Sequence, residues 1–278
     1  MLLSLFFAVL LFFKPNYLEI LGYLLSTLIG VSLGLIGSGG SILAVPILVY
    51  LFGVTPENAT THSLFIVGIT SVIASYKHHR QNNLKIKTAL LFGIPSLITL
   101  LLTRKFILPA LPEIIFSTGN FQLSKHTLIM VVFSVLMIAA ALSMIRRNRE
   151  VQNTTVSGSR LIIIGLLVGL VTGFLGAGGG FLIVPALLFY ANLDLKYAIA
   201  TSVFIITINS LIGFAGDLIN GVQFDKVLLA KVSAAAILGM FIGIGISKKM
   251  DGKKLKPLFG WFILIMGVFI VVKELVLG

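Results

Sequence analysis

The sequence predicts an all-α, polytopic membrane protein built from two inverted repeats, in which glycine-broken helices meet near the middle of the membrane. Three observations predict this class. The chain of 278 residues is 58% hydrophobic and only 11% charged, whereas soluble domains carry about 25% charged residues. Its apolar residues form segments long enough for membrane helices, and a glycine-rich string inside an apolar run occurs twice. We therefore expect a multi-pass protein of the cell membrane.

Ten apolar segments follow an apolar N-terminal stretch, and a polar linker divides them into five and five. They span 17–36, 41–52, 59–76, 86–103 and 126–145, then 161–175, 181–193, 197–215, 227–246 and 256–277. The predicted units are an N-terminal apolar segment (1–16), a first membrane repeat (17–145), a cytoplasmic linker (146–160) and a second membrane repeat (161–278). The N-terminal apolar segment (1–16) is short for a helix that crosses the whole membrane. It has neither a preceding basic residue nor a small-residue cleavage site, so we expect no cleaved signal peptide.

The repeated string reads GLIGSGGSILAVP at residues 34–46 and GFLGAGGGFLIVP at residues 173–185, with seven of thirteen positions identical. The same offset of 139 pairs Ser63 with Ser202 and Ser71 with Ser210, so the register extends well beyond the string. Glycine costs roughly 1 kcal/mol relative to alanine inside a helix. Each string therefore predicts a helix break, and a doubled break indicates the transport site of an inverted-repeat carrier.

Three basic segments, at 77–87, 146–160 and 248–256, orient the chain. Because Lys and Arg accumulate in cytoplasmic loops, we place all three there, which explains much of the net charge of +12 without a nucleic-acid partner. Positive charge also favours anions near the mouth of a pathway. The segments 104–125 and 216–225 then become outward loops, the second of them bounded by Asp217. The third apolar segments of the two halves run in opposite directions, which makes the repeats inverted.

Each glycine string is a candidate half-site for an anion. A helix that begins after a break presents unpaired N–H groups and the positive end of its dipole, and two facing helix starts would form an anion-binding nest. Close helix packing through small residues is the alternative, and the residues alone leave both open. The candidates are Gly37, Ser38, Gly39, Gly40 and Ser41 in the first string and Gly176, Ala177, Gly178, Gly179 and Gly180 in the second.

Pro46 and Pro185 are the last residues of the two strings, beyond the glycines at matching positions. A proline inside a helix frees a carbonyl group and kinks the helix. Both are therefore candidate hinges, and a tolerated proline in a membrane helix is the alternative.

Polar residues gather in the third apolar segment of each half. Hydroxyl and amide groups donate hydrogen bonds to an oxyanion without adding negative charge. The candidate pocket residues are Thr61, His62 and Ser63 in the first half and Thr201, Ser202 and Asn209 in the second. Interhelical hydrogen bonding is the alternative for the hydroxyls, and helix capping is the interpretation favoured for Asn58 and Thr60. His62 is the titratable member, either as a pH sensor or as a structural histidine.

The sequence offers no set of catalytic or metal-binding residues. Cysteine is absent, and His78 and His79 lie in a basic loop without acidic neighbours, so we expect neither a metal site nor a cofactor. Acids are nearly missing from the apolar segments, which argues against a proton relay through buried carboxylates. The expected partners are a small-molecule anion and the lipid bilayer, with no nucleic acid. The oligomeric state is left open.

The two glycine strings, followed by the Thr/Ser segments, resemble the TauE/SafE family of membrane proteins, the sulfite exporter family. The resemblance spans residues 17–277 and implies an integral transporter of two homologous halves, linked to export of sulfite or sulfonates. The first copy has Ser38 and Ser41 where the second has Ala177 and Gly180, so the first half-site would supply extra hydroxyls. By position, the family motif falls on Gly34, Gly37, Gly39, Gly40 and Pro46, and on Gly173, Gly176, Gly178, Gly179 and Pro185.

We therefore predict a secondary transporter, not an enzyme, that exports a small sulfur-containing oxyanion such as sulfite or an organosulfonate. The alternatives are a membrane scaffold and a carrier of another small organic anion. An intramembrane enzyme has less support, because His62 is the one residue inside the apolar segments suited to catalysis.

Overall fold

The computed structural model describes residues 15–36, 40–118, 121–145, 158–176, 178–247 and 252–277. Among these residues, ten helices of eleven residues or more match the ten predicted segments and confirm the all-α class. The first five are α2 (Pro15–Ile36), α3 (Ser41–Phe52), α4 (Pro56–Arg80), α5 (Ile86–Leu102) and α7 (Lys125–Ile145). The second five are α8 (Gly158–Leu175), α9 (Gly180–Tyr190), α10 (Leu195–Ile219), α11 (Lys226–Ser247) and α12 (Gly252–Val272). α12 continues into a π-helical turn, η2 (Lys273–Leu277).

The predicted division into units is only partly covered by the structure. Most of the N-terminal segment and most of the linker lie outside the described residues, and α8 already begins inside the predicted linker, at Gly158. The duplication and inversion of the two halves stay predictions.

Within the described ranges, six helices are long and apolar enough to span a membrane. α3 and α9 are shorter, with 12 and 11 residues. At 1.5 Å per residue each covers only about half of a hydrocarbon core of about 30 Å. Each begins within a glycine string, and Gly40 and Gly180 at their starts are buried. Both short helices therefore start inside the protein.

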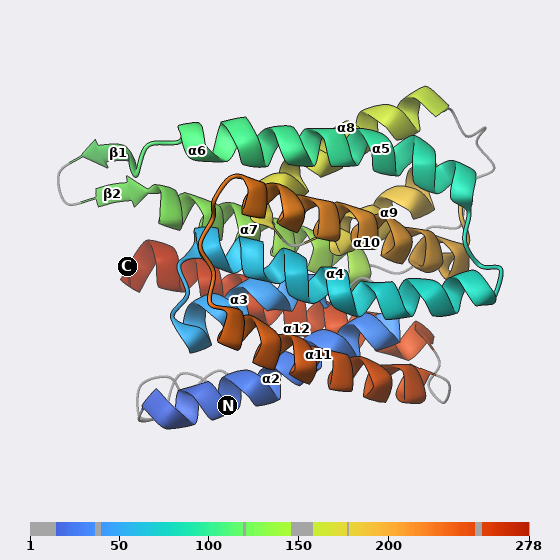
Figure 1. Cartoon of the computed structure of the whole chain (residues 1–278), viewed down its shortest axis with the longest axis horizontal. Helices are drawn as coiled ribbons and strands as arrows, with labels where there is room; N and C mark the ends of the chain where they lie inside the picture. Colours follow the sequence, from blue (N-terminus) through green and yellow to red (C-terminus); the bar gives the residue numbers. More distant parts are fainter. Residues whose placement is uncertain are drawn as a thin grey trace.

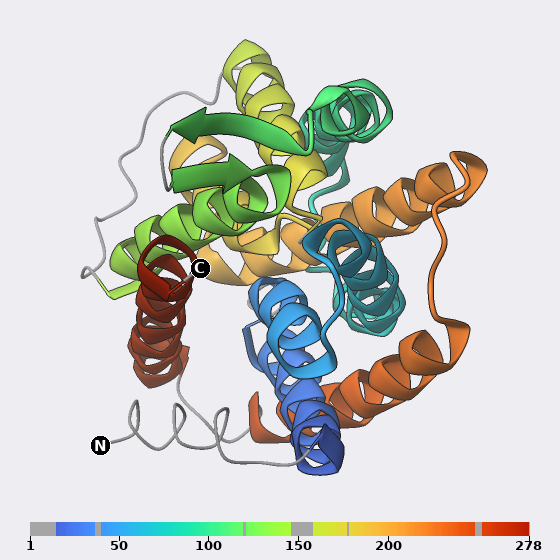
Figure 2. The same ribbon diagram turned by 90° about the vertical axis from the view of Figure 1, so that its left-hand side faces the viewer.

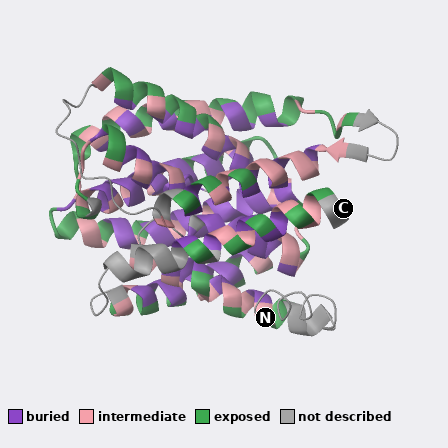
Figure 3. Cartoon of the chain, turned by 180° about the vertical axis from the view of Figure 1, so that it is seen from behind, coloured by how far each residue is buried: buried purple, intermediate pink, exposed green. Residues whose placement is uncertain are grey.

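Four pairs of helices pack side by side, namely α2 with α11, α5 with α8, α7 with α12 and α4 with α10. Figure 2 shows α2 beside α11, α5 beside α8 and α7 beside α12, with α3 near the middle of the view. In the most apolar 18-residue stretch of α4 and of α10, 67% and 61% of the residues are buried. In the other four spanning helices the corresponding share is 28% to 39%. Buried residues accordingly gather at the middle of the bundle in Figure 3. α4 and α10 are the helices best placed to line a protected site.

The outer pairs α2–α11 and α5–α8 meet through glycines. A Cβ atom at Gly30 of α2 would lie 1.7 Å from the carbonyl oxygen of Ala236 in α11. A Cβ atom at Gly169 of α8 would lie 2.1 Å from the carbonyl oxygen of Ser96 in α5. Gly30 and Gly169 are related by the offset of 139. Small residues bring membrane helices into this kind of backbone contact, and each pair joins one helix of the first half to one of the second.

The bundle has two distinct ends, shown in Figure 1. At one end, the basic end, α4 finishes at Arg80 and α5 begins at Ile86. At the other, the hairpin end, lie the strands β1 (Ile114–Thr118) and β2 (Phe121–Ser124) together with the connection between α10 and α11. α4 runs toward the basic end and α10 runs away from it. The residues at the starts of these two central helices therefore lie at opposite ends of the molecule.

The prediction of an outward loop over 104–125 is wrong at its beginning. The helix of α5 continues through a π-helical turn, η1 (Thr103–Ile107), and a short helix, α6 (Leu108–Ala110), before β1 and β2 form an antiparallel hairpin. The structure instead buries Arg104, because a carboxylate neutralises it inside the bundle.

We predict that Gly243→Ala lowers the melting temperature of the purified protein in detergent. The new Cβ atom would lie 2.3 Å from the carbonyl oxygen of Val31 and force α11 away from α2, and overpacking of this kind costs about 1–3 kcal/mol. Gly245→Ala is the matched control, because nothing lies within 4 Å of that position on the same helix. Alanine is preferred in helices, so the control should be neutral or stabilising. Equal melting temperatures for the two variants would contradict the contact.

Candidate functional site

The break between α8 and α9 requires glycine for its backbone conformation. Gly176, Gly178 and Gly179 have φ angles of 63°, 62° and 73°. Residues with a Cβ atom rarely adopt this left-handed region. Ala177 lies outside the described residues. The second glycine string is thus a helix break, as the sequence predicts.

This break passes between the two central helices. A Cβ atom at Gly176 would lie 2.2 Å from the Cβ of Thr60 in α4. A Cβ atom at Gly178 would lie 2.7 Å from the hydroxyl oxygen of Ser210 in α10 and 3.1 Å from a methyl group of Val67 in α4. Both glycines therefore also permit close approach of neighbouring side chains.

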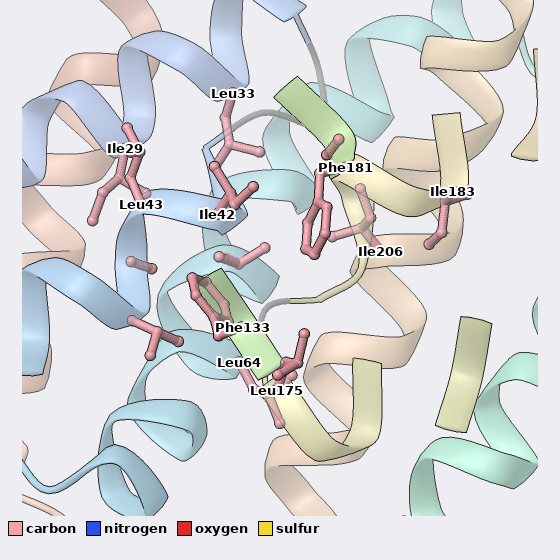
Figure 4. Packing of buried hydrophobic residues seen from close by; sticks show 14 of the residues in the cluster. Ile29, Leu33, Ile42, Leu43, Leu64, Phe133, Leu175, Phe181, Ile183 and Ile206 are labelled. Atoms are coloured by element: carbon pink, nitrogen blue, oxygen red, sulfur yellow. The ribbon is translucent and has the colours of Figure 1, made fainter. Parts of the chain in front are cut away.

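Apolar side chains surround the starts of α3 and α9, and the two helices contact each other. Figure 4 shows Ile42 at the start of α3 and Phe181 at the start of α9 in one cluster with Phe133 of α7 and Leu64 of α4. These side chains are at most 4% exposed. In such a low-dielectric environment the electrostatic effect of helix ends and hydrogen-bond donors is stronger than in water.

A buried hydroxyl at the second break has no partner. Ser210 is fully buried, and its Oγ atom makes no hydrogen bond to any described residue. Its counterpart in α4, Ser71, donates to the carbonyl oxygen of Gly68 at 2.9 Å. Leaving a buried polar group unpaired costs about 1–3 kcal/mol. Ser210 and the first N–H groups of α9 together offer hydrogen-bond donors to an anion.

The first break differs where it is described. Gly40 caps α3 with φ −68° and ψ −29°, a right-handed conformation open to any residue. A Cβ atom there would lie 2.1 Å from the carbonyl oxygen of Ile29, so close packing accounts for this glycine. Gly37, Ser38, Gly39 and the side chain of Ser41 lie outside the described residues. A clamp formed by both breaks therefore stays a prediction.

The predicted polar residues do not form one pocket. Thr61 donates a hydrogen bond to Asp217 Oδ2 at 2.7 Å near the hairpin end. Thr201 accepts one from the backbone N–H of Lys85 at 3.1 Å near the basic end. Ser202 donates to a carbonyl oxygen of its own helix at 2.9 Å. The antiparallel courses of α4 and α10 separate the two groups.

Two further candidates are buried between helices. Asn209 Nδ2 donates to Ser96 Oγ of α5 at 2.9 Å, which is an interhelical hydrogen bond. Its Oδ1 atom and the Oγ of Ser63 have no partner within the described residues. The amide of Asn209 thus ties α10 to α5, and Ser63 retains an unused donor.

His62 lies under the connection between α10 and α11. Its Nδ1 atom donates to the carbonyl oxygen of Asn58 at 2.7 Å, and its ring stands edge-on to Phe224 with centroids 6.3 Å apart. Its Nε2 atom is buried and has no described partner. In the same connection, the backbone N–H groups of Leu228 and Val227 hold the pKa of Asp225 below its ordinary value. The pH-sensing and structural interpretations of His62 both stay open.

The sequence missed a buried polar network at the hairpin end. Arg104 of η1 and Asp217 of α10 form an ion pair, and the two residues are 5% and 4% exposed. Arg104 Nε donates to Asp217 Oδ1 at 2.7 Å, and Nη2 donates to Asp217 Oδ2. Nη2 also contacts Thr61 Oγ1 at 2.9 Å and Thr60 Oγ1 at 3.3 Å. Asp217 is therefore buried and paired, although the residues that follow it at the end of α10 are exposed.

Arg104 also stabilises the broken end of α8. Its Nη1 atom donates to the carbonyl oxygen of Gly173 at 3.1 Å. Gly173 lies in the last turn of α8, where carbonyl groups lack intrahelical partners and the helix dipole is negative. The network thus joins four helical segments at the point where the chain enters the second break.

The two predicted hinges lie inside short helices. Pro46 lies within α3 and Pro185 within α9, and both helices continue through the proline. Their role in motion stays a prediction. Among the described residues, no group of three or more His, Asp or Glu side chains is arranged to hold a metal ion.

These features define a class of protein. A bundle of membrane-spanning helices, with half-length helices that start at buried breaks beside polar side chains, is the architecture of a multi-pass membrane transporter. The chain belongs to the sulfite exporter TauE/SafE family, whose model matches residues 23–270.

Similar proteins agree with this class. The probable membrane transporter protein YdhB of Bacillus subtilis is 28% identical over 234 residues, which cover 82% of this chain and 90% of that protein. A probable membrane transporter protein of Methanocaldococcus jannaschii is 26% identical over 257 residues, which cover 87% and 91%. One of Xylella fastidiosa (strain 9a5c) is 27% identical over 256 residues, which cover 88% and 91%.

We predict that Arg104→Met destabilises the protein by about 3–5 kcal/mol, because it leaves the Asp217 carboxylate buried without its cation. Arg104→Met with Asp217→Leu should be more stable than the single variant, since replacing both members of a buried pair is far less costly. Melting temperatures in detergent compare the two. Arg80→Met removes an exposed charge and serves as the control. A double variant no more stable than the single one would argue against the pair.

Proposed function

We propose that this transporter is a secondary carrier that exports a small sulfur-containing oxyanion such as sulfite or an organosulfonate. In this proposal the anion binds at the second helix break, where its oxygens accept hydrogen bonds from Ser210 and from the first N–H groups of α9. We propose no catalytic residue, cofactor or metal for it.

The observation that carries the proposal is the unpartnered Ser210 hydroxyl beside the left-handed turn at Gly178. Neutral donors and a helix start suit an anion of one or two charges, because they stabilise negative charge without a fixed counter-ion. The apolar side chains around the helix starts exclude water, which strengthens those interactions. Glycine at position 178 lets the Ser210 hydroxyl approach the backbone of the break closely.

The Arg104 network supplies the outer closure of the proposed pathway. It joins η1, α4, α8 and α10 at the hairpin end, next to the break itself. Release of an anion on that side requires these segments to separate. The antiparallel courses of α4 and α10 support a rocking motion of two inverted halves about the site, with Pro46 and Pro185 as hinges.

The membrane potential favours the proposed direction. In a cell that is negative inside, outward movement of an anion is downhill by about 2.3 kcal/mol per charge per 100 mV. A uniporter therefore suffices for export. The buried acid of the described spans, Asp217, is already paired with Arg104, which supports a mechanism without a proton relay.

A titration of the purified protein tests the substrate class. Sulfite, sulfoacetate, thiosulfate, sulfate, phosphate and chloride are each added in detergent, and the melting temperature is measured. A ligand that binds the folded state raises it. Selective stabilisation by a sulfur oxyanion, followed by flux of that anion in proteoliposomes, is the expected result. Stabilisation by phosphate or chloride alone would contradict a carrier of sulfur oxyanions, and no response from folded protein would favour a scaffold.

We predict that Ser210→Ala weakens binding of sulfite about 10-fold or more, because a hydrogen bond to a charged group contributes about 1.5–3 kcal/mol. Ser71→Ala is the matched control. It removes the corresponding hydroxyl of α4, which already bonds to Gly68. Binding is measured by the same thermal titration. Equal affinity in the two variants would remove Ser210 from the site.

A further inference from the structure

A cavity at the basic end is lined by positive side chains. It has a volume of about 140 Å³ and lies between α2, α4, α10 and α11. Its polar walls are Lys77 and His78 at the end of α4 and Lys196 at the start of α10. The other lining residues that the structure describes are apolar or glycine, and none of them is acidic. The position is distinct from the second break and from the Arg104 network at the opposite end.

The charges in this cavity are arranged for an anion. The Nδ1 atom of His78 is buried and has no partner in the part of the chain that the structure describes. Lys196 stands in the first turn of α10, two residues after the N-cap residue Asp194. Together with Lys77 it places two ammonium groups beside one space, which favours a negatively charged ligand there.

The size of the cavity selects a small ion. A single water molecule needs about 10–15 Å³ of such space, and pockets for drug-sized ligands begin near 300 Å³. A cavity of about 140 Å³ therefore admits a small oxyanion with part of its hydration shell. It is too small for a nucleotide or a folded peptide segment.

The cavity also lies on the path toward the first break. Gly34 and Leu35 form its α2 wall, and Gly34 is the first residue of the first glycine string. Ile244 of α11 closes the other side, where α11 packs along α2. An anion held by Lys77 and Lys196 would thus stand beside the start of the glycine string.

We infer that this cavity is the loading site for the transported oxyanion on the cytoplasmic side, and that Lys77, His78 and Lys196 bind it there before it reaches the helix breaks. This inference rests on the proposed function, because it assumes that the chain carries an oxyanion. The phosphate of an anionic lipid headgroup has the same chemistry, and the experiment below separates the two sources.

The test measures initial rates of labelled sulfite transport in membrane vesicles whose cytoplasmic face points outward. Lys77→Gln with Lys196→Gln should raise KM for sulfite about 10-fold, equivalent to 1.4 kcal/mol, with little change in kcat. Lys77→Arg with Lys196→Arg retains the charge and should keep the KM of the unmodified protein. Arg80→Gln with Lys87→Gln is the matched control, because it removes two exposed charges from the same end outside the cavity.

The outcomes distinguish the inference from the proposed function. Unchanged KM in the Lys77 and Lys196 variant, with sulfite transport intact, would overturn the loading site alone. Absence of transport and binding of every anion in the unmodified protein would overturn both. The measurement is repeated in proteoliposomes made of zwitterionic lipid only. The same rise in KM is expected there, and a rise that needs anionic lipid would assign the cavity to headgroups and contradict a substrate site.

Discussion

Backbone groups freed inside a membrane protein must find partners, and this constraint shapes the centre of the molecule. α8 stops and α9 starts within the bundle, so carbonyl groups at one end and N–H groups at the other lose their helical partners. The Arg104 guanidinium donates a hydrogen bond to the carbonyl oxygen of Gly173. We propose that a substrate anion accepts hydrogen bonds from the first N–H groups of α9. The freed backbone groups would then be paired with Arg104 at one end of the break and with the transported anion at the other.

The buried ion pair follows from the same constraint. A guanidinium placed against the end of α8 in a low-dielectric interior needs a negative partner, and Asp217 supplies it with correct two-point geometry. Thr61 donates to the same carboxylate, so the start of α4 is tied to the end of α10. Electrostatics at this site thereby hold together segments from both halves of the chain. The cationic cavity lies at the other end, and the lining residues that the structure describes include no acid.

The helices and the second break could be predicted because their signals are local. A run of apolar residues predicts its own helix, and three closely spaced glycines predict their own break. The Arg104–Asp217 pair gave no such signal, because 113 residues separate its members and each stands beside residues typical of a membrane edge. The two groups of hydroxyls were also assigned to one pocket. Their separation depends on the directions of α4 and α10, which a residue pattern within either helix does not express.

The glycine contacts between α2 and α11 have a consequence for biogenesis. α2 ends at residue 36 and α11 begins at residue 226, so about 190 further residues are synthesised before α2 meets its neighbour. At roughly 5–20 residues per second this takes about 10–40 s. During that interval the glycine face of α2 lacks the helix that covers it, and the nascent chain stays open to wrong helix pairing or to protection by insertion factors. Final assembly of the first half therefore has to wait for the last helices to leave the ribosome.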